Sequence, residues 1–271
     1  MKLTCLMGYK YLPQFALVKK HSGLDLRLYS TENVEDESSY REEALEALIE
    51  SDLIFIHRGS ESFWIEFEPK LKELRKSVPI VCLGYDSSYW MLSSAPMNVV
   101  LIANTYLTYG GEDNVRNMLL YLCKELLNMQ TDCYPPQQMP WEGLYHPDAP
   151  SHFQNLREYL KWYQPDDGPT VAILFPRFYW TNKTLDVEDE LIRVLERMGM
   201  NAIPVFSHPF KDVELGTRSM AEVVADYFMV DGRSRIDALI KTTPFSLGQS
   251  RESNGDAKNN KTSIDLFKTL N

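Results

Sequence analysis

The apolar and polar positions of this chain follow two patterns, which together predict an α/β fold. Short continuous apolar runs are typical of strands that are buried on both faces of a parallel sheet. In the first half of the chain such runs cover residues 2–7, 24–29, 53–57, 80–84 and 98–103. Helical spacing of apolar residues separates several of them, at residues 42–50, 64–77 and from Glu112 onward. The first half is therefore expected to alternate strands with helices.

The same alternation returns near the end of the chain. Apolar runs at residues 170–175, 201–206 and 236–242 predict strands, and residues 184–198 and 220–228 predict helices. We expect a capping box at the start of the first of these helices, from Thr184 to Glu188, and a glycine stop at Gly199. A last helical pattern at residues 260–270 has no strand after it, so the second unit is expected to be incomplete.

Residues 128–169 show neither the continuous apolar runs nor the helical spacing. The segment is rich in proline, which donates no backbone hydrogen bond, and a regular sheet is not expected there. It also carries many aromatic side chains, so it should pack against a domain surface or a ligand rather than act as a free linker. The predicted organisation is a first α/β domain at 1–127, a connecting segment at 128–169 and a second α/β domain at 170–271.

Two successive sets of strand–helix units predict two doubly wound parallel sheets of the Rossmann or flavodoxin type, joined by right-handed crossovers. Ligands of such sheets bind at the carboxyl ends of the strands. These ends are expected at Gly8-Tyr9, His57-Arg58, Gly84-Tyr85, Pro176-Arg177, Ser207-His208 and Thr243-Pro244.

Composition and charge exclude several classes of function. The chain of 271 residues has a formal net charge of −10, and its few Lys-rich stretches are short, so non-specific nucleic-acid binding is not expected. No apolar run reaches the length of about 18 residues that a membrane span needs, and no secretion signal is present at the start. The 4 cysteines form no CxxC pair and are expected to be free thiols. These features predict a cytoplasmic protein.

Common catalytic and nucleotide motifs are missing. The sequence contains no GxGxxG, no GxxxxGK[ST] and no GxSxG. His146 with Asp148 suits either a small metal or proton-handling pair, or a hydrogen-bonded structural histidine. His57 and His208 each follow an apolar strand, where either a ligand contact or a capping role is expected.

The most unusual feature is the run Arg177-Phe178-Tyr179-Trp180 directly after a predicted strand. Aromatic faces beside a guanidinium suit a flat macrocycle that carries carboxylate arms. An aromatic cluster that closes a seam between domains explains the run equally well. Both interpretations stay open at this point.

Taken together, several stretches resemble the cobaltochelatase large subunit of the CobN type, which is related to the magnesium chelatase large subunit. The matching stretches are YLTYGGEDNVRNML (106–119), PWEGLYHPDAP (140–150), VAILFPRFYW (171–180), VLERMGMNAIPVF (194–206) and DGRSRIDALIKTTPFSLG (231–248). They follow the order and spacing of the family over roughly residues 100–250. The first hundred residues match only as a plausible strand–helix scaffold.

The resemblance implies a part in ATP-dependent insertion of cobalt, or of magnesium, into a tetrapyrrole, with cobalamin biosynthesis as the leading pathway. It also implies a long large subunit and two smaller ATPase-type subunits as partners. This chain resembles the amino-terminal portion alone, so it carries over no catalytic residue, and we expect it to bind no cofactor and to be inactive by itself. The residues expected to face the tetrapyrrole, or to dock other chelatase domains instead, are Trp141, Tyr145, His146, Arg177, Tyr179, Trp180 and His208.

Overall fold

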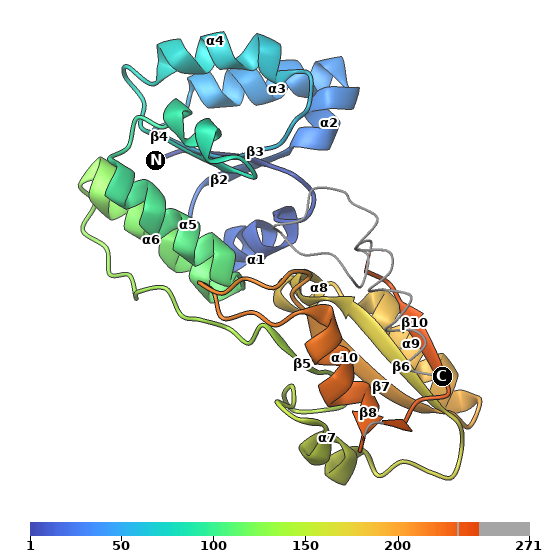
Figure 1. Ribbon diagram of the computed structural model, residues 1–271. Coiled ribbons are helices and arrows are strands. Elements are labelled where there is room, and N and C mark those ends of the chain that lie inside the picture. The colour runs from blue at the N-terminus through green and yellow to red at the C-terminus, as the bar shows by residue number, and fades with distance from the viewer. Residues whose placement is uncertain (232, 244–271) are drawn as a thin grey trace. The chain divides into compact units, whose positions relative to one another are not determined.

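The computed structural model describes residues 1–231 and 233–243, and these form two compact units. The first unit comprises Met1–Met139 together with Thr181–Lys183, and the second comprises Pro140–Trp180 and the described residues from Thr184 onward. Both units are α/β, which confirms the predicted fold class. Figure 1 shows the elements with the labels used below.

The first unit is built on a parallel sheet, sheet A, whose strands run in the order β2-β1-β3-β4. The strands are β1 (Leu3–Met7), β2 (Leu26–Ser30), β3 (Leu53–Arg58) and β4 (Ile80–Gly84). Almost every residue of β1, β3 and β4 is buried, as the continuous apolar runs predict for a sheet covered on both faces. The chain leaves β1 toward β2 on one side and continues to β3 on the other, so the topological switch point lies between β1 and β3.

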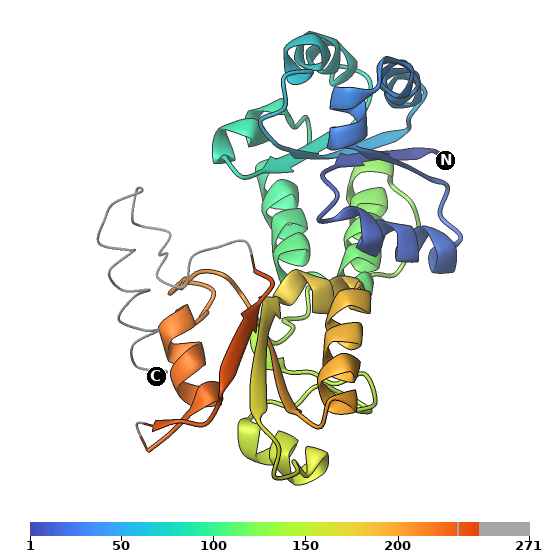
Figure 2. The same cartoon turned by 90° about the vertical axis from the view of Figure 1, so that its right-hand side faces the viewer.

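Helices cover both faces of sheet A (Figure 2). One face packs a core cluster with α1 (Leu12–Ser22), α5 (Met97–Tyr109) and α6 (Glu112–Leu127). The other face packs a second cluster with α3 (Ser38–Ile49), α4 (Trp64–Leu74) and the 3-10 helix η1 (Ser87–Leu92), beside the short α2 (Thr31–Asp36). The unit is therefore doubly wound.

One predicted strand of the first unit is wrong. Residues 98–103 belong to α5, where the buried residues Val99, Val100, Ala103, Tyr106 and Leu107 recur at helical spacing. The apolar run hid this spacing because the outward residues Leu101 and Ile102 are also apolar. A continuous apolar run does not by itself distinguish a strand from a buried helix.

The second unit contains sheet B, with the strand order β10-β6-β7-β5. Strands β6 (Thr170–Pro176), β7 (Asn201–Ser207) and β10 (Ala238–Lys241) are parallel, whereas β5 (Glu142–Leu144) pairs with β7 in the antiparallel direction. Helices α7 (Leu156–Tyr163), α9 (Asp186–Arg197) and α10 (Met220–Phe228) accompany them, with the short α8 (Arg177–Asn182) and the small hairpin of β8 (Met229–Val230) and β9 (Arg233–Ser234).

Sheet B corrects two predictions. It is mixed rather than purely parallel, and the proline-rich segment contributes strand β5 to it. Pro140 and Pro147 lie outside the three residues of β5, and an edge strand needs donors on one side only. The prolines therefore bound a strand instead of preventing one.

The helix caps also differ in part from the expectation. Helix α9 begins at Asp186 with Leu185 at the N-cap and no side-chain cap, so the capping box predicted at Thr184 is wrong. The structure has a capping box at Ser219 and Glu222, which start α10. Gly199 ends α9 with φ +74°, as predicted from its place after the helix.

Other expectations fall partly outside the described residues. Pro244, expected at the end of a strand, and the helix predicted at 260–270 lie there. Within residues 1–231 and 233–243, all four cysteines are free, and Cys5, Cys82 and Cys123 are buried. No helix in this part of the chain is long and apolar enough to cross a membrane.

Candidate functional site

Three of the predicted residues meet at the carboxyl edge of sheet B. Arg177 follows the last residue of β6, and His208 follows the last residue of β7. Strand β5 pairs Glu142 with Ser207, so Trp141, just before β5, lies beside His208. We call Arg177, Trp141 and His208 the Arg177 cluster.

The contacts within the Arg177 cluster are specific. The guanidinium carbon of Arg177 lies 4.5 Å from the centroid of the Trp141 ring, and Arg177 Nε donates to the Pro140 carbonyl at 2.6 Å. The rings of Trp141 and His208 lie 5.5 Å apart at 74°, and the His208 backbone N–H donates to the Trp141 carbonyl at 2.9 Å. One edge of the sheet thus holds a cation, an indole and an imidazole in a fixed arrangement.

Burial determines the electrostatic environment of the Arg177 cluster. Arg177 and Trp141 are each only 6% exposed, whereas His208 is half-buried. Burial lowers the pKa of Arg177 to about 10, opposed by the carboxylate of Glu142, so the guanidinium stays charged at neutral pH. Glu142 in turn accepts from Arg218 at 2.8 Å. The cluster is therefore a partly desolvated positive charge against an aromatic face.

Tyr179 and Trp180 lie on α8, a short helix that follows β6 directly. Trp180 stacks on Phe206 with ring centroids 4.3 Å apart and planes 4° apart. Both Tyr179 and Trp180 are half-buried and pack, with Tyr145, against the core cluster around Phe175. The rings of Phe178 and Tyr179 lie 4.4 Å apart at 60°.

Tyr145 and His146 are held by partners within the unit. The Tyr145 hydroxyl donates to Asp189 at 2.8 Å, and burial together with that carboxylate raises the pKa of the phenol. His146 is 3% exposed, and its Nε2 lies 2.9 Å from Glu196. Its Nδ1 accepts from the Asp148 backbone at 3.2 Å, so Nε2 carries the proton and donates to Glu196.

These contacts favour the structural interpretation of His146. The Asp148 carboxylate forms an ion pair with Arg193 instead of turning to His146, from which it lies 3.9 Å away. Residues 1–231 and 233–243 contain no group of three or more His, Cys, Asp or Glu that could hold a metal ion. The described residues therefore offer no built metal centre.

The carboxyl edge of sheet A carries a second aromatic group, which the sequence indicated only in part. His57 lies within β3, and its ring is 4.3 Å from Tyr11 and 5.1 Å from Tyr85. Burial, followed by the nearby Lys10 ammonium, lowers the pKa of His57 to about 4, so the imidazole is neutral at pH 7. The signal for Tyr11 and Tyr85 was their place just beyond the ends of β1 and β4, near the switch point.

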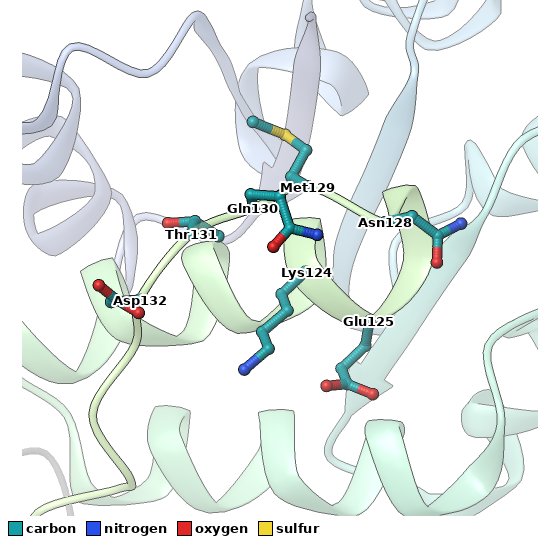
Figure 3. Close-up of a pocket in the computed structure, with 7 residues that line it drawn as sticks. All are labelled: Lys124, Glu125, Asn128, Met129, Gln130, Thr131 and Asp132. Atoms are coloured by element: carbon teal, nitrogen blue, oxygen red, sulfur yellow. The ribbon is translucent and has the colours of Figure 1, made fainter.

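The structure also has a pocket of about 490 Å³ at the end of α6 (Figure 3). All of its lining residues come from the last turns of α6 and the chain directly after it: Lys124, Glu125, Asn128, Met129, Gln130, Thr131 and Asp132. The lining has no histidine, cysteine or aromatic ring. It therefore offers no aromatic stacking face, in contrast to the edges of the two sheets.

Comparison with known proteins adds independent findings. The family model for CobN/magnesium chelatase matches residues 104–271. An uncharacterized protein of Methanocaldococcus jannaschii is 33% identical over 257 residues, which cover 93% of this chain and 19% of that protein. A magnesium-chelatase subunit of Chlorobaculum parvum is 26% identical over 152 residues, which cover 54% of this chain and 11% of that protein.

A solved structure is also similar. The catalytic subunit of cobaltochelatase from Mycobacterium tuberculosis superposes with a TM-score of 0.56 and 18% sequence identity, over 99% of this chain and 20% of that chain. At this identity the likeness concerns the fold. The chain spans a fifth or less of the length of these relatives.

Proposed function

This chain belongs to the CobN/magnesium chelatase family, as the resemblance of its motifs predicted, and from that premise we propose that it is a scaffold and tetrapyrrole-recognition part of a chelatase large subunit. The complete subunit would insert cobalt into a corrin ring with the help of ATP hydrolysis by separate subunits in the cytoplasm. Insertion of magnesium into a porphyrin is the alternative within the same family. In either case the metal is a substrate, and this chain alone would have no turnover.

The observation that carries the proposal is the contact of Arg177 with Trp141 beside His208. The positive potential of a guanidinium attracts carboxylates, and its partly desolvated site strengthens that attraction. Aromatic side chains contact flat rings over a large area. A flat macrocycle with carboxylate arms needs both features at one place.

The burial of the individual side chains assigns them different tasks. His208, Tyr179 and Trp180 are half-buried, so a ligand can reach them at the edge of sheet B. Arg177 and Trp141 are nearly covered, so they would orient the site and supply its positive potential. Tyr145 and His146 are engaged with Asp189 and Glu196, so we assign them a supporting role behind the site.

The same burial supports a second candidate from another class. Arginine and tryptophan are also enriched in protein–protein interfaces. The alternative is therefore that this chain is an interaction module, which docks other chelatase domains or subunits. In that case the aromatic side chains at the edge of sheet B would contact protein rather than a tetrapyrrole.

One variant separates the two functions. His208→Ala keeps the buried pair of Arg177 and Trp141 and removes a half-buried ring, while His21→Ala changes an exposed histidine of the first unit as a control. For tetrapyrrole recognition, His208→Ala should weaken corrinoid or porphyrin binding about tenfold, and His21→Ala should not. If tetrapyrrole affinity is unchanged while assembly with the rest of the subunit is weakened, the interaction module is the correct function.

A further inference from the structure

Helix α5 presents an outer face without charge. None of its 13 residues, MNVVLIANTYLTY, is Asp, Glu, Lys or Arg. Three large apolar side chains on it are exposed to solvent, Met97 at 48%, Leu101 at 50% and Ile102 at 36%. Met97 and Leu101 are four residues apart and lie on one face of the helix. Ile102 lies about 100° further round the helix and extends the exposed apolar surface beside Leu101.

The core of the first unit does not need this stripe. The opposite face of α5 supplies Val99, Val100 and Ala103 to the cluster beneath sheet A, and these residues are fully or almost fully buried. A surface helix normally pairs such an apolar face with a charged one. The outward side of α5 instead carries no charge, and combines these apolar side chains with uncharged polar ones such as Asn98 and Thr105.

Other helices of the first unit show the ordinary pattern. On α4, Lys70 pairs with Glu66, and Lys72 pairs with Glu68 on the solvent side. On α6, exposed positions include Asp113, Arg116 and Lys124. In a chain with a net charge of −10, the uncharged face of α5 is therefore a local feature and does not follow from the composition.

We propose that the outer face of α5, defined by Met97, Leu101 and Ile102, docks an apolar surface of the remaining part of the same large subunit. The inference rests on the part of the proposed function that places this chain within a longer subunit. Relatives are about five times longer than the matched region, so they contain ample protein to cover the face.

The size of the face favours this occupant over a second copy of the chain. Stable association of separate chains buries about 800 Å² on each partner, which three partly exposed side chains do not supply. A domain on the same polypeptide is held at a high effective concentration, so a small apolar contact is sufficient there. The lack of charge on α5 requires the docking surface to be apolar as well, because a buried unpaired charge is costly.

Hydroxyl-radical footprinting of the chain alone and of the complete large subunit tests the inference. Labelling of Met97 and Leu101 should fall at least about fivefold in the complete subunit, since covered side chains lose contact with solvent. Ile65 on α4, which is 84% exposed, and Val213 in the second unit, which is 86% exposed, serve as controls that should stay labelled. Equal labelling of Met97 and Leu101 in the two samples overturns the inference, and so does dimerisation of the chain through α5 in sedimentation experiments.

A charged variant gives a second measurement. Leu101→Glu should leave the melting temperature of the chain nearly unchanged but weaken its binding to the separately produced remainder of the subunit at least about tenfold. Ile65→Glu is the matched control and should bind like the unchanged chain. Equal binding by the two variants contradicts the inference.

Tetrapyrrole titration separates this result from the proposed function. Loss of docking by Leu101→Glu with unchanged tetrapyrrole binding supports both. A chain that binds no tetrapyrrole but loses docking on substitution of Leu101 refutes recognition at the Arg177 cluster and leaves the docking face standing.

Discussion

The guanidinium of Arg177 lies over the ring of Trp141 at 4.5 Å, although one residue starts helix α8 and the other precedes strand β5. The pairing of β5 with β7 brings them together, because it turns the proline-rich segment toward the carboxyl edge of sheet B. The contact joins two of the stretches of sequence that resemble the chelatase family, 140–150 and 171–180. It links the stability of the second unit to the proposed site.

Arg177→Ala should destabilise the second unit by about 3 kcal/mol, because it removes a charged hydrogen bond to Pro140 and the packing against Trp141. Arg177→Lys keeps the charge but loses the planar face, and we expect a smaller loss of about 1–2 kcal/mol. Urea denaturation of the two variants and of the unchanged chain measures their free energies of unfolding and so their order of stability. Equal stability of Arg177→Ala and the unchanged chain would show that the contact contributes nothing.

The burial of His57 predicts that acid weakens the first unit. Its pKa is about 4 in the folded protein against the ordinary 6.5, so between these values the unfolded chain binds a proton that the folded chain does not. Stability should therefore be complete above pH 6.5 and fall by about 3 kcal/mol as the pH drops to 4. His57→Phe keeps ring contacts to Tyr11 and Tyr85 without titrating, and denaturation between pH 4 and pH 7 should give it a shallower pH slope. Parallel slopes would contradict the assignment.

Glu188 predicts a dependence of the opposite sign. The side chain is 2% exposed, burial raises its pKa, and Thr242 donates to it at 3.0 Å. Because the folded state holds the proton more tightly than the unfolded state, stability falls as the pH rises through the pKa of the buried acid. Glu188→Gln keeps the acceptor without a charge, so its melting temperature should exceed that of the unchanged chain at pH 8. The difference should vanish well below pH 4.5, and a variant that melts lower at pH 8 would refute the argument.

The helix caps offer a direct contrast between sequence pattern and structure. Ser219→Ala removes the capping box of α10 and should cost about 1 kcal/mol. Thr184→Ala, at the position where the sequence pattern predicted a box, should change stability by less than about 0.5 kcal/mol. Thermal denaturation of both variants decides the point, and a larger loss for Thr184→Ala would favour the sequence pattern.

Burial explains why several strands are predictable from the sequence. The predictions for β1, β3 and β6 were correct because nearly all residues of these strands are buried. Buried strands need apolar side chains at every position, so each appears in the sequence as a continuous apolar run. The same rule misassigned α5, because the exposed Leu101 and Ile102 join its buried residues into a continuous apolar run. The error and the proposed docking face have one physical origin.

The sequence predicted the residues of the Arg177 cluster individually but not their contact with one another. Strand ends indicated Arg177 and His208, and aromatic content indicated Trp141, but the contact among them depends on β5. Three residues between prolines carry no strand signal of their own, and their pairing comes from the exposed edge of β7. His146 shows the reverse case, in which a suggestive sequence pair is explained by the hydrogen bond to Glu196.

An absorbance titration of the unmodified chain with a corrinoid, and in parallel with protoporphyrin, tests the central claim most directly. If the chain contains a tetrapyrrole-recognition site, the absorption bands of one macrocycle should shift saturably with one equivalent of protein. Bands that stay in place for both macrocycles at every protein concentration, while the folded state is intact by circular dichroism, would contradict it.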